Sequence, residues 1–408
     1  MAPGFYIILM AQFLSALADN TLLFSAIALL KEIHAANWYT PVLQEFFVFS
    51  YIVLAPFVGA FSDALAKGRV MFISNNIKLL GCGMMLTGFS PLLAYAIVGI
   101  GAAAYSPAKY GILTEYLPSE KLVAANAWME GTTVLAIVLG ALFGGILLNP
   151  HFSVMFAQHL PWPIQGDTAK FSILVVGLLY VLAAALNLFI PVTAPDHDTP
   201  SRNPIDLVRD FWHSFKQLWL DPLGQVSLAV TTLFWGAGAT LRLVILAWAV
   251  AVMHFSMQQA TQLTALVAVG IAIGAVIAGE FIKLNNAIRV VSTGIMMGVV
   301  VMAMSWVTNP VLAAILLTLI GILGGFFVVP MNALLQHRGH LLMGAGHSIA
   351  VQNFNENLSI LLLLGVYALL DRAGLSISFI TLLFGAFISI SMLSIRVHFR
   401  HINPDHHA

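Results

Sequence analysis

Residues 101–113 read GAAAYSPAKYGIL, and residues 325–336 read GFFVVPMNALLQ. The two stretches match with Pro107 set against Pro330, which lies 223 residues later. Each stretch covers the end of an apolar run of about 20 residues, the length that a helix needs to cross about 30 Å of hydrocarbon. The pair therefore predicts a membrane protein whose two halves have similar structures.

The composition of the whole chain also indicates a membrane protein. Hydrophobic residues make up 60% of the 408 residues, and charged residues make up only 8%. Soluble proteins average roughly 25% charged residues, so lipid is the expected solvent for most of this chain. The sequence has 17 basic and 17 acidic residues, and this balance argues against nucleic-acid binding. Its single cysteine, Cys82, can form no internal disulfide.

Apolar windows of this length predict twelve membrane-spanning helices. The first window is too long for the core of a signal peptide, and its first positive charge comes after the apolar run, so we expect it to stay in the mature protein. The expected fold class is an all-α polytopic membrane protein. The windows cover residues 4–30, 42–61, 70–89, 91–112, 122–147, 170–192, 225–252, 262–282, 289–307, 310–332, 347–369 and 374–395.

A polar stretch, residues 193–222, divides the windows into six and six. Its proline-rich front is typical of a linker. Further along, from Ile205 to Leu220, apolar residues recur at helical spacing opposite charged ones, which predicts an amphipathic helix at the cytoplasmic interface. The expected domains are a six-helix bundle, this linker, a second six-helix bundle and a cytoplasmic tail: residues 1–192, 193–222, 223–395 and 396–408.

The positions of lysine and arginine predict the orientation of the chain. If the first span runs outward, eleven of these 17 residues fall in the inner loops and the tail, and three fall in the outer loops. Positive residues collect on the cytoplasmic side of membrane proteins. We therefore expect both termini in the cytoplasm.

The two halves match at further positions in the same order. Asp19 and Arg242 are again 223 residues apart. Two polar pairs match at an offset of 226: Asn126 and Glu130 against Gln352 and Glu356. Two six-helix halves of the same orientation form the parallel repeat of the major facilitator architecture. We therefore expect a major facilitator fold with two pseudo-symmetric halves.

The loop after the second window supports this expectation. Residues 59–70, GAFSDALAKGRV, resemble the major facilitator signature Gly-x-x-x-Asp-Arg-x-Gly-Arg at Gly59, Asp63, Gly68 and Arg69. They depart from it at Ala64, which stands where the signature has arginine, and Gly68 comes two residues late. In that superfamily the charges of this loop latch the cytoplasmic side. The resemblance therefore implies gating roles for the charged residues of the loop: Asp63, Lys67 and Arg69.

Asp19 is the one acidic residue of the first window. Gln12 and Ser15 precede it at helical spacing and form a polar stripe with it. A charge near the bilayer centre costs about 2.5–3.5 kcal/mol on insertion scales, so we expect Asp19 to have a structural or functional role. If the first and seventh windows face each other across a central cavity, Asp19 can meet Arg242 there. The sequence leaves open whether this pair is a structural salt bridge or a gate that breaks and re-forms during transport.

Four further charged residues within the predicted spans are candidates for a functional role. Lys109 is near the inner end of its window, where it either extends its ammonium to the interface or binds a ligand. Lys78 lies deeper, so reaching the interface is harder. Glu130 and Glu356 each follow an amide by four residues, and a hydrogen bond between the two suits a neutral glutamic acid in a polar seam between helices. Either glutamate could instead carry protons.

The sequence contains none of the enzyme motifs that would compete with a transport function. It has no Gly-x-x-x-x-Gly-Lys-Ser/Thr phosphate loop, no Gly-x-Ser-x-Gly elbow and no His-Glu-x-x-His. His406 and His407 lie in the polar tail, and nothing near them in the sequence completes a metal site. We therefore expect a protein that is not an enzyme and that uses neither a metal nor a cofactor.

Several runs together resemble one branch of the superfamily, the bacterial lysophospholipid transporters. The resemblance covers nearly all predicted spans and both halves, and it is weakest at residues 148–169 and in the linker. The runs are AQFLSALADNTLLF (11–24), LAPFVG (54–59), AKGRVM (66–71), VGIGAAAYSPAKYGIL (98–113), LFWGAGATLR (233–242), GGFFVVPMNALLQHRG (324–339) and GAGHSIAVQNFNEN (344–357).

This resemblance implies a function, a location and partners. It implies that lysophospholipids move from the outer to the inner leaflet of the bacterial inner membrane by alternating access. A separate acyltransferase, acyl-ACP synthetase, would then restore the missing chain inside. We expect a multi-pass monomer surrounded by membrane lipids. By the same resemblance, Asp19, Lys109 and Arg242 fall on the charged cavity positions of the family.

The chemistry of these residues suits such a cargo. The headgroup of lysophosphatidylethanolamine carries a phosphate and an ammonium. Arg242 or Lys109 can hold the phosphate through charge-assisted hydrogen bonds, while Asp19 faces the ammonium or keeps Arg242 paired. The expected substrate-binding residues are Asp19, Asn20, Lys78, Lys109, Glu130, Arg242, Gln352 and Glu356.

Two other functions stay open at the level of sequence. A proton-driven major facilitator carrier of drugs or small organic ions would use Glu130 or Asp19. A lipid-binding scaffold that does not transport would bind lysophospholipid and present it to the cytoplasmic acyltransferase.

Overall fold

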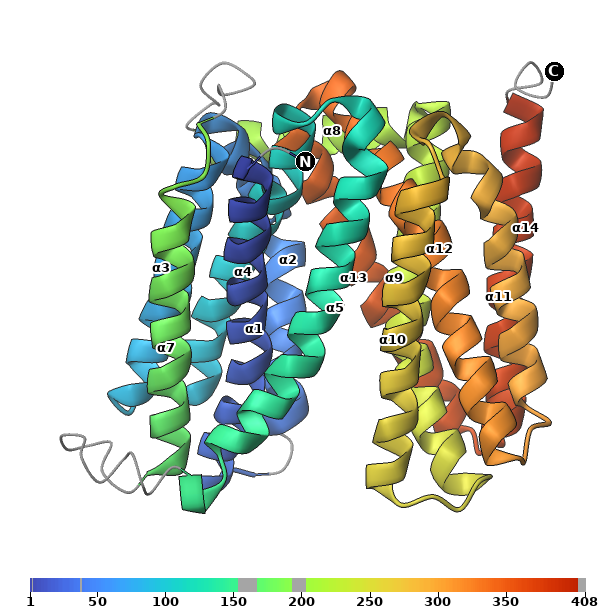
Figure 1. Ribbon diagram of the computed structural model, residues 1–408, viewed down its shortest axis with the longest axis horizontal. Coiled ribbons are helices and arrows are strands. Elements are labelled where there is room, and N and C mark those ends of the chain that lie inside the picture. The colour runs from blue at the N-terminus through green and yellow to red at the C-terminus, as the bar shows by residue number, and fades with distance from the viewer. Residues whose placement is uncertain (2, 37–38, 153–166, 193–202, 403–408) are drawn as a thin grey trace. The chain divides into compact units, whose positions relative to one another are not determined.

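The computed structural model describes residues 1, 3–36, 39–152, 167–192 and 203–402, and nearly all of them are helical (Figure 1). This part of the chain contains no strand. The long helices are α1 (Pro3–Glu32), α2 (Tyr39–Ala64), α3 (Lys67–Leu86), α4 (Pro91–Tyr116), α5 (Leu122–Leu147), α7 (Thr168–Asn187), α8 (Pro204–Leu220), α9 (Pro222–Ala251), α10 (Met257–Phe281), α11 (Val291–Met304), α12 (Pro310–Met343), α13 (Ala345–Arg372) and α14 (Ile377–Ile402).

Each of the twelve predicted windows coincides with one of these helices, and α8 is the helix left over. Among the described residues, eleven helical segments are long and apolar enough to cross a membrane. α3 is the twelfth helix, and its charged and amide residues, Lys78 and Asn75 among them, lower its hydropathy. The prediction of an all-α polytopic membrane protein is confirmed.

Two helices continue beyond the apolar windows that predicted them. α12 was expected to end near residue 332 but runs to Met343, so that Arg338 is helical and does not lie in a loop. Its guanidinium donates two hydrogen bonds to the carboxylate of Asp221, at 3.1 and 2.5 Å. This ion pair stabilises polar helical turns that hydropathy alone cannot predict. α14 likewise runs to Ile402, past the expected end at residue 395, while the proline-rich front of the linker lies outside the described residues.

The described residues form two compact units. Unit 1 comprises Met1–Tyr116, Leu135–Trp212 and Gly344–Ala350. Unit 2 comprises Leu117–Val134, His213–Met343 and Val351–Ala408. Each unit thus contains a short piece of the other sequence half, because the start of α5 belongs to unit 2 and the start of α13 belongs to unit 1.

Unit 1 is built around the close packing of α3 on α4 and of α1 on α7 (Figure 1). Leu22, Tyr95, Ile173 and Tyr180 belong to its largest apolar core. Gly101 lets α4 approach α3, since a Cβ atom there would lie 2.7 Å from the carbonyl oxygen of Ser74. The site described below depends on this close approach.

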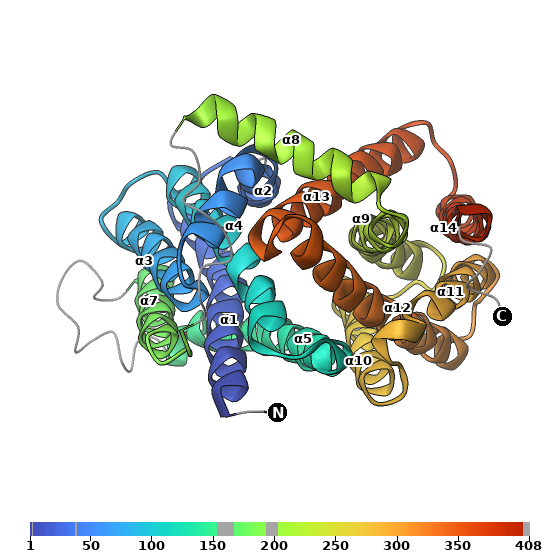
Figure 2. The same ribbon diagram turned by 90° about the horizontal axis from the view of Figure 1, so that it is seen from above.

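Unit 2 is built around α10 and α12, with α9 and α11 packed beside them and α14 packed on α9 and α11 (Figure 2). Two glycines one turn apart on each of α10 and α12 face the other helix. A Cβ atom at any of these glycines would collide with the backbone of the partner helix, so the helices pack backbone against backbone. The glycines are Gly270 and Gly274 on α10 and Gly321 and Gly325 on α12.

Two turns support the internal duplication. His34 and His254 are the only described non-glycine residues with a left-handed backbone, with φ of 54° and 55°. His34 follows α1 and His254 follows α9, the helices that the repeat sets against each other. Equivalent turns therefore end the first helix of each sequence half.

The segment predicted to be amphipathic forms α8, which lies across the direction of α9 (Figure 2). Phe211 and Leu218 on it are buried. Arg209, Asp210 and Lys216 are exposed, so the helix has one packed face and one charged face.

Candidate functional site

A buried group of charged and polar side chains lies inside unit 1, where α1, α3 and α7 meet. The ammonium of Lys78 lies 2.8 Å from one carboxylate oxygen of Asp19 and donates a 3.0 Å hydrogen bond to the Ser15 hydroxyl. The Tyr180 hydroxyl donates to the other Asp19 oxygen at 2.7 Å. The Ser15 hydroxyl in turn donates to the side-chain oxygen of Asn75 at 2.8 Å. The polar stripe of the first span therefore packs against polar side chains of α3.

The two ions of this group differ in their access to solvent. The side chain of Lys78 is 1% exposed, whereas that of Asp19 is 22% exposed. The ammonium also lies 4.7 Å from the centre of the Tyr105 ring and 5.6 Å from that of Tyr180. Aromatic faces attract cations, so the rings and the carboxylate together replace water around the ammonium. Lys78 does not reach towards an interface.

Arg242 has a different environment from Asp19. Arg242 lies on α9 and is exposed, and within unit 2 it forms no ion pair with a described residue. Asp19 and Arg242 belong to different units, so their pairing stays a prediction. Asn20, beside Asp19, donates its amide to the carbonyl of Ala16 in its own helix at 2.8 Å.

The predicted gating loop forms a second charged cluster, also within unit 1. One oxygen of the Asp63 carboxylate accepts from Lys67 at 2.8 Å and from the backbone N–H of Gly346 at 2.7 Å. The other oxygen lies 2.7 Å from Nδ1 of His347 and accepts from the backbone N–H of His347 at 3.0 Å. Lys67 also lies 3.0 Å from Glu115 at the end of α4.

This cluster fixes the N-terminus of α13. The first N–H groups of a helix have no partner within the helix, and a carboxylate there is favoured by the helix dipole. Gly346 is needed for the fit, because a Cβ atom there would lie 2.5 Å from the Asp63 carboxylate. Arg69, the third predicted gating residue, is exposed and forms no ion pair with any described residue.

Unit 2 contains a chain of amides and carboxylates. The Asn332 amide donates to Glu130 at 3.3 Å, and Gln352 donates to Asn332 at 3.0 Å and to Glu356 at 2.7 Å. The hydrogen bond predicted between Gln352 and Glu356 is confirmed. All four side chains are buried.

The corresponding hydrogen bond predicted between Asn126 and Glu130 is wrong. Asn126 and Gln336 exchange two hydrogen bonds of 2.8 Å each, one in each direction. Asn126 also donates to the carbonyl of Leu122. A second amide offers both a donor and an acceptor, which satisfies Asn126 better than a carboxylate would.

Lys109 is buried near the end of α4. Its ammonium lies 4.7 Å from the centre of the Tyr110 ring, and the residue is 9% exposed. The alternative that it extends into water at the interface does not fit this burial.

Comparison with known proteins shows which family the chain resembles. The family model of the Major Facilitator Superfamily matches residues 8–362. The lysophospholipid transporter LplT of Escherichia coli O157:H7 is 43% identical over 395 residues, which are 97% of this chain and 95% of that protein. The LplT of Yersinia pestis (strain Pestoides F) is 45% identical over 368 residues, 90% and 86% of the two chains.

The chain belongs to the lysophospholipid transporter family of the major facilitator superfamily. A solved structure agrees with its fold: the major facilitator transporter FucP, in the outward conformation, has a TM-score of 0.77 at 15% identity over 98% of this chain and 99% of that one. The predicted family and fold are confirmed. Members of this superfamily are transporters, so this lysophospholipid transporter family member is not an enzyme.

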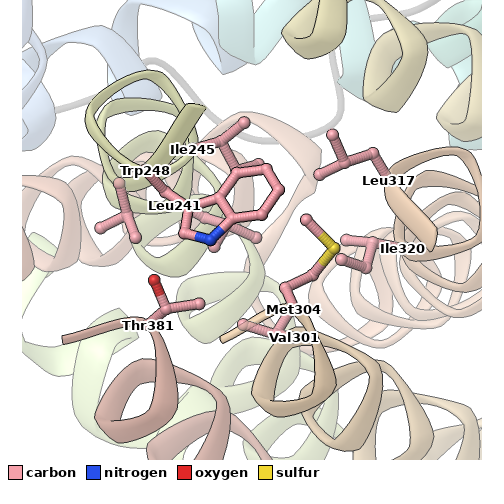
Figure 3. A pocket seen from close by; sticks show the side chains of 9 residues that line it. Leu241, Ile245, Trp248, Val301, Met304, Leu317, Ile320 and Thr381 are labelled. Atoms are coloured by element: carbon pink, nitrogen blue, oxygen red, sulfur yellow. The ribbon is translucent and has the colours of Figure 1, made fainter. Parts of the chain in front are cut away.

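An apolar pocket lies within unit 2 of this lysophospholipid transporter family member, and Figure 3 shows its lining. Trp248 borders it, and its buried indole N–H has no hydrogen-bond partner among the described residues. No lining residue is charged, so the pocket cannot hold a phosphate. Helices α9, α11, α12 and α14 supply the lining: Leu241, Val244, Ile245, Trp248, Val301, Met304, Leu317, Ile320 and Thr381.

Sequence reasoning did not assign roles to several partners of the predicted residues. Tyr180 lies in an apolar run in which a tyrosine looks like an ordinary core residue. His347 lies in the run GAGHSIAVQNFNEN, which carries the family resemblance, and Glu115 is a charge at the end of a span; both were available signals. Asn332 and Gln336, one turn apart in the repeat stretch of α12, were also visible as a polar stripe.

Proposed function

We propose that the protein transports lysophospholipids across the bacterial inner membrane, from the outer to the inner leaflet, by alternating access. In this proposal a cytoplasmic acyltransferase, acyl-ACP synthetase, restores the second chain. The proposal also keeps the expected arrangement: two pseudo-symmetric halves, residues 1–192 and 223–395, with both termini in the cytoplasm.

The proposal rests on one observation: Arg242, on the membrane-spanning helix α9, is exposed and forms no ion pair within the described part of unit 2. A guanidinium on a membrane-spanning helix is costly unless it has a partner, and within unit 2 Arg242 has none among the described residues. Its five N–H donors form a rigid fork that matches the geometry of a phosphate or a carboxylate. The identity to proteins named lysophospholipid transporters supports a phosphate-bearing lipid as that partner.

The other charged residues have subordinate roles in the proposal. Lys109, buried near the end of α4, is a second phosphate ligand. The Asp63 cluster, which fixes the start of α13, acts as the cytoplasmic latch. The pairing of Asp19 with Arg242 is kept as a transient contact that the headgroup replaces.

Uptake of labelled lysophosphatidylethanolamine into proteoliposomes tests the proposal. We expect uptake by the wild type, loss of most uptake in Arg242→Ala, and partial retention in Arg242→Lys, which keeps the charge without the planar fork. Arg209→Ala is the matched control, because Arg209 is exposed on the charged face of α8 and has no proposed role in binding or gating. Transport by Arg242→Ala at the wild-type rate would refute the role of Arg242.

A proton-coupled carrier is the second candidate, and Glu356 favours it. This buried carboxyl accepts a hydrogen bond from Gln352 and has no cationic partner among the described residues. A pH gradient imposed on the same proteoliposomes separates the candidates. A proton-coupled carrier responds to the gradient through Glu356, whereas a lysophospholipid facilitator transports equally with and without it.

A further inference from the structure

We propose that Lys78 is a specificity-determining residue: it balances the charge of Asp19, so that the site does not select lysophospholipid headgroups by their net charge. The inference rests on the proposed function. In this inference, the buried Lys78 allows the site to accept both ammonium-bearing and anionic headgroups.

Two side chains of unit 1 already donate hydrogen bonds to the Asp19 carboxylate. One oxygen accepts from Lys78 and the other accepts from Tyr180. The carboxylate therefore does not need the ammonium of a headgroup to be neutralised. Because its side chain is 22% exposed, it still presents a polar surface to a ligand.

Lys78 is held so that it cannot easily leave Asp19. Its ammonium has the Ser15 hydroxyl as a second acceptor and the faces of two tyrosine rings beside it. The aliphatic part of its side chain packs against Gly101 of α4, where a Cβ atom would lie 2.7 Å from Cγ of Lys78. Moving the ammonium away from Asp19 while it stays buried would leave it without a counter-ion, which is strongly unfavourable.

The Asp19–Lys78 pair determines how the site responds to the net charge of a headgroup. Lysophosphatidylethanolamine has a phosphate and an ammonium and is neutral overall, whereas lysophosphatidylglycerol has only the phosphate and carries one negative charge. The Asp19–Lys78 pair has no net charge, so it neither attracts nor repels the additional charge. Without Lys78 the carboxylate would repel an anionic headgroup, and without Asp19 the ammonium would attract it.

The test measures the uptake of both labelled lysolipids by the reconstituted full-length protein and compares their ratio. We expect Lys78→Gln to lower the ratio of lysophosphatidylglycerol to lysophosphatidylethanolamine uptake by about tenfold, the scale of one unpaired charge at close range in a protein. Asp19→Asn should raise the ratio. The double variant, which removes both charges, should return it to the wild-type value.

Lys170→Gln is the matched control. It also removes one lysine charge from unit 1, but Lys170 pairs with Asp167 at the start of α7 and does not contact Asp19. Its uptake ratio should equal that of the wild type. If Lys78→Gln fails to fold, as judged by its elution from a sizing column, Asp19→Asn tests the same idea with the opposite sign, and the double variant tests it by its return to the wild-type ratio.

The outcomes separate the inference from the proposed function. If the wild type moves neither lysolipid, the proposed function fails and the inference fails with it. If the wild type moves both and the folded variants keep the wild-type ratio, only the inference is overturned. Equal loss of both lipids in every variant would also overturn it, because that pattern shows a structural role.

Discussion

Replacing Asp63 with asparagine should free the start of α13. The carboxylate accepts two backbone hydrogen bonds, from Gly346 and His347, and pairs with two side chains, Lys67 and His347. Asparagine has the same shape, but only one of its two terminal atoms can accept a hydrogen bond. One backbone N–H of α13 therefore loses its acceptor, and Lys67 loses one of its two carboxylates.

The size of the effect follows from these partners. Breaking a buried ion pair costs about 3–5 kcal/mol, because the remaining charge is buried without compensation. Lys67 keeps Glu115 at 3.0 Å and the carbonyl of Ser62 at 2.7 Å, so the residual charge is partly compensated. We therefore expect Asp63→Asn to lower the free energy of unfolding by about 3 kcal/mol, the lower end of that range.

Hydrogen exchange at the amides of Gly346 and His347 measures this change directly. In the purified protein, Asp63→Asn should exchange these amides faster than the wild type, and its thermal unfolding in detergent should start at a lower temperature. Arg69→Gln in the same loop is the control, since the exposed Arg69 has no ion pair in the described structure. Unchanged amide protection in Asp63→Asn would show that the cluster does not fix α13.

Two further predictions concern unit 2. Asn126→Leu should destabilise the protein by about 1–3 kcal/mol, because the buried Gln336 amide loses both its hydrogen bonds, and adding Gln336→Leu should recover much of that loss in thermal unfolding; a double variant less stable than the single one would contradict this reasoning. Burial raises the pKa of Asp221, but its hydrogen bonds with Arg338 and with the backbone of Gly224 outweigh burial and lower the pKa below the ordinary value of 3.8. The stabilisation from Asp221 is therefore present above pH 3.8 and is lost as the pH falls through the lowered pKa. Arg338→Gln should be less stable than the wild type at pH 7, and the difference should shrink on acidification; a difference independent of pH would refute the assignment.

The helices could be predicted from the sequence because lipid imposes a simple rule. Every spanning segment must bury its backbone in a helix with an apolar surface, so a window of apolar residues locates each span. The rule fails where polar contacts extend a helix. The last turns of α12 are polar, and their ion pair between Arg338 and Asp221 joins residues 117 positions apart.

The partners of the buried charges could not be predicted in the same way. Helical periodicity identifies the polar face of α1, but it does not say which of the other helices that face meets. The repeat suggested Arg242 for Asp19, because equivalent helices of the two halves carry opposite charges. Within unit 1 the carboxylate is held by Lys78 and Tyr180, which lie 59 and 161 positions further along the chain.

The difference between these partners changes what Asp19 can do. A carboxylate whose only counter-ion lay on another part of the protein would have to stay paired or bear the full cost of an unpaired buried charge. A carboxylate that keeps Lys78 as a counter-ion can gain or lose another partner at a much smaller cost, since it is never unpaired. Asp19 is therefore suited to a contact that forms and breaks, and the exposed Arg242 stays accessible to the phosphate that we propose it binds. If Lys78 is the permanent partner, Lys78→Gln should slow the transport of lysophosphatidylglycerol about tenfold more than that of lysophosphatidylethanolamine.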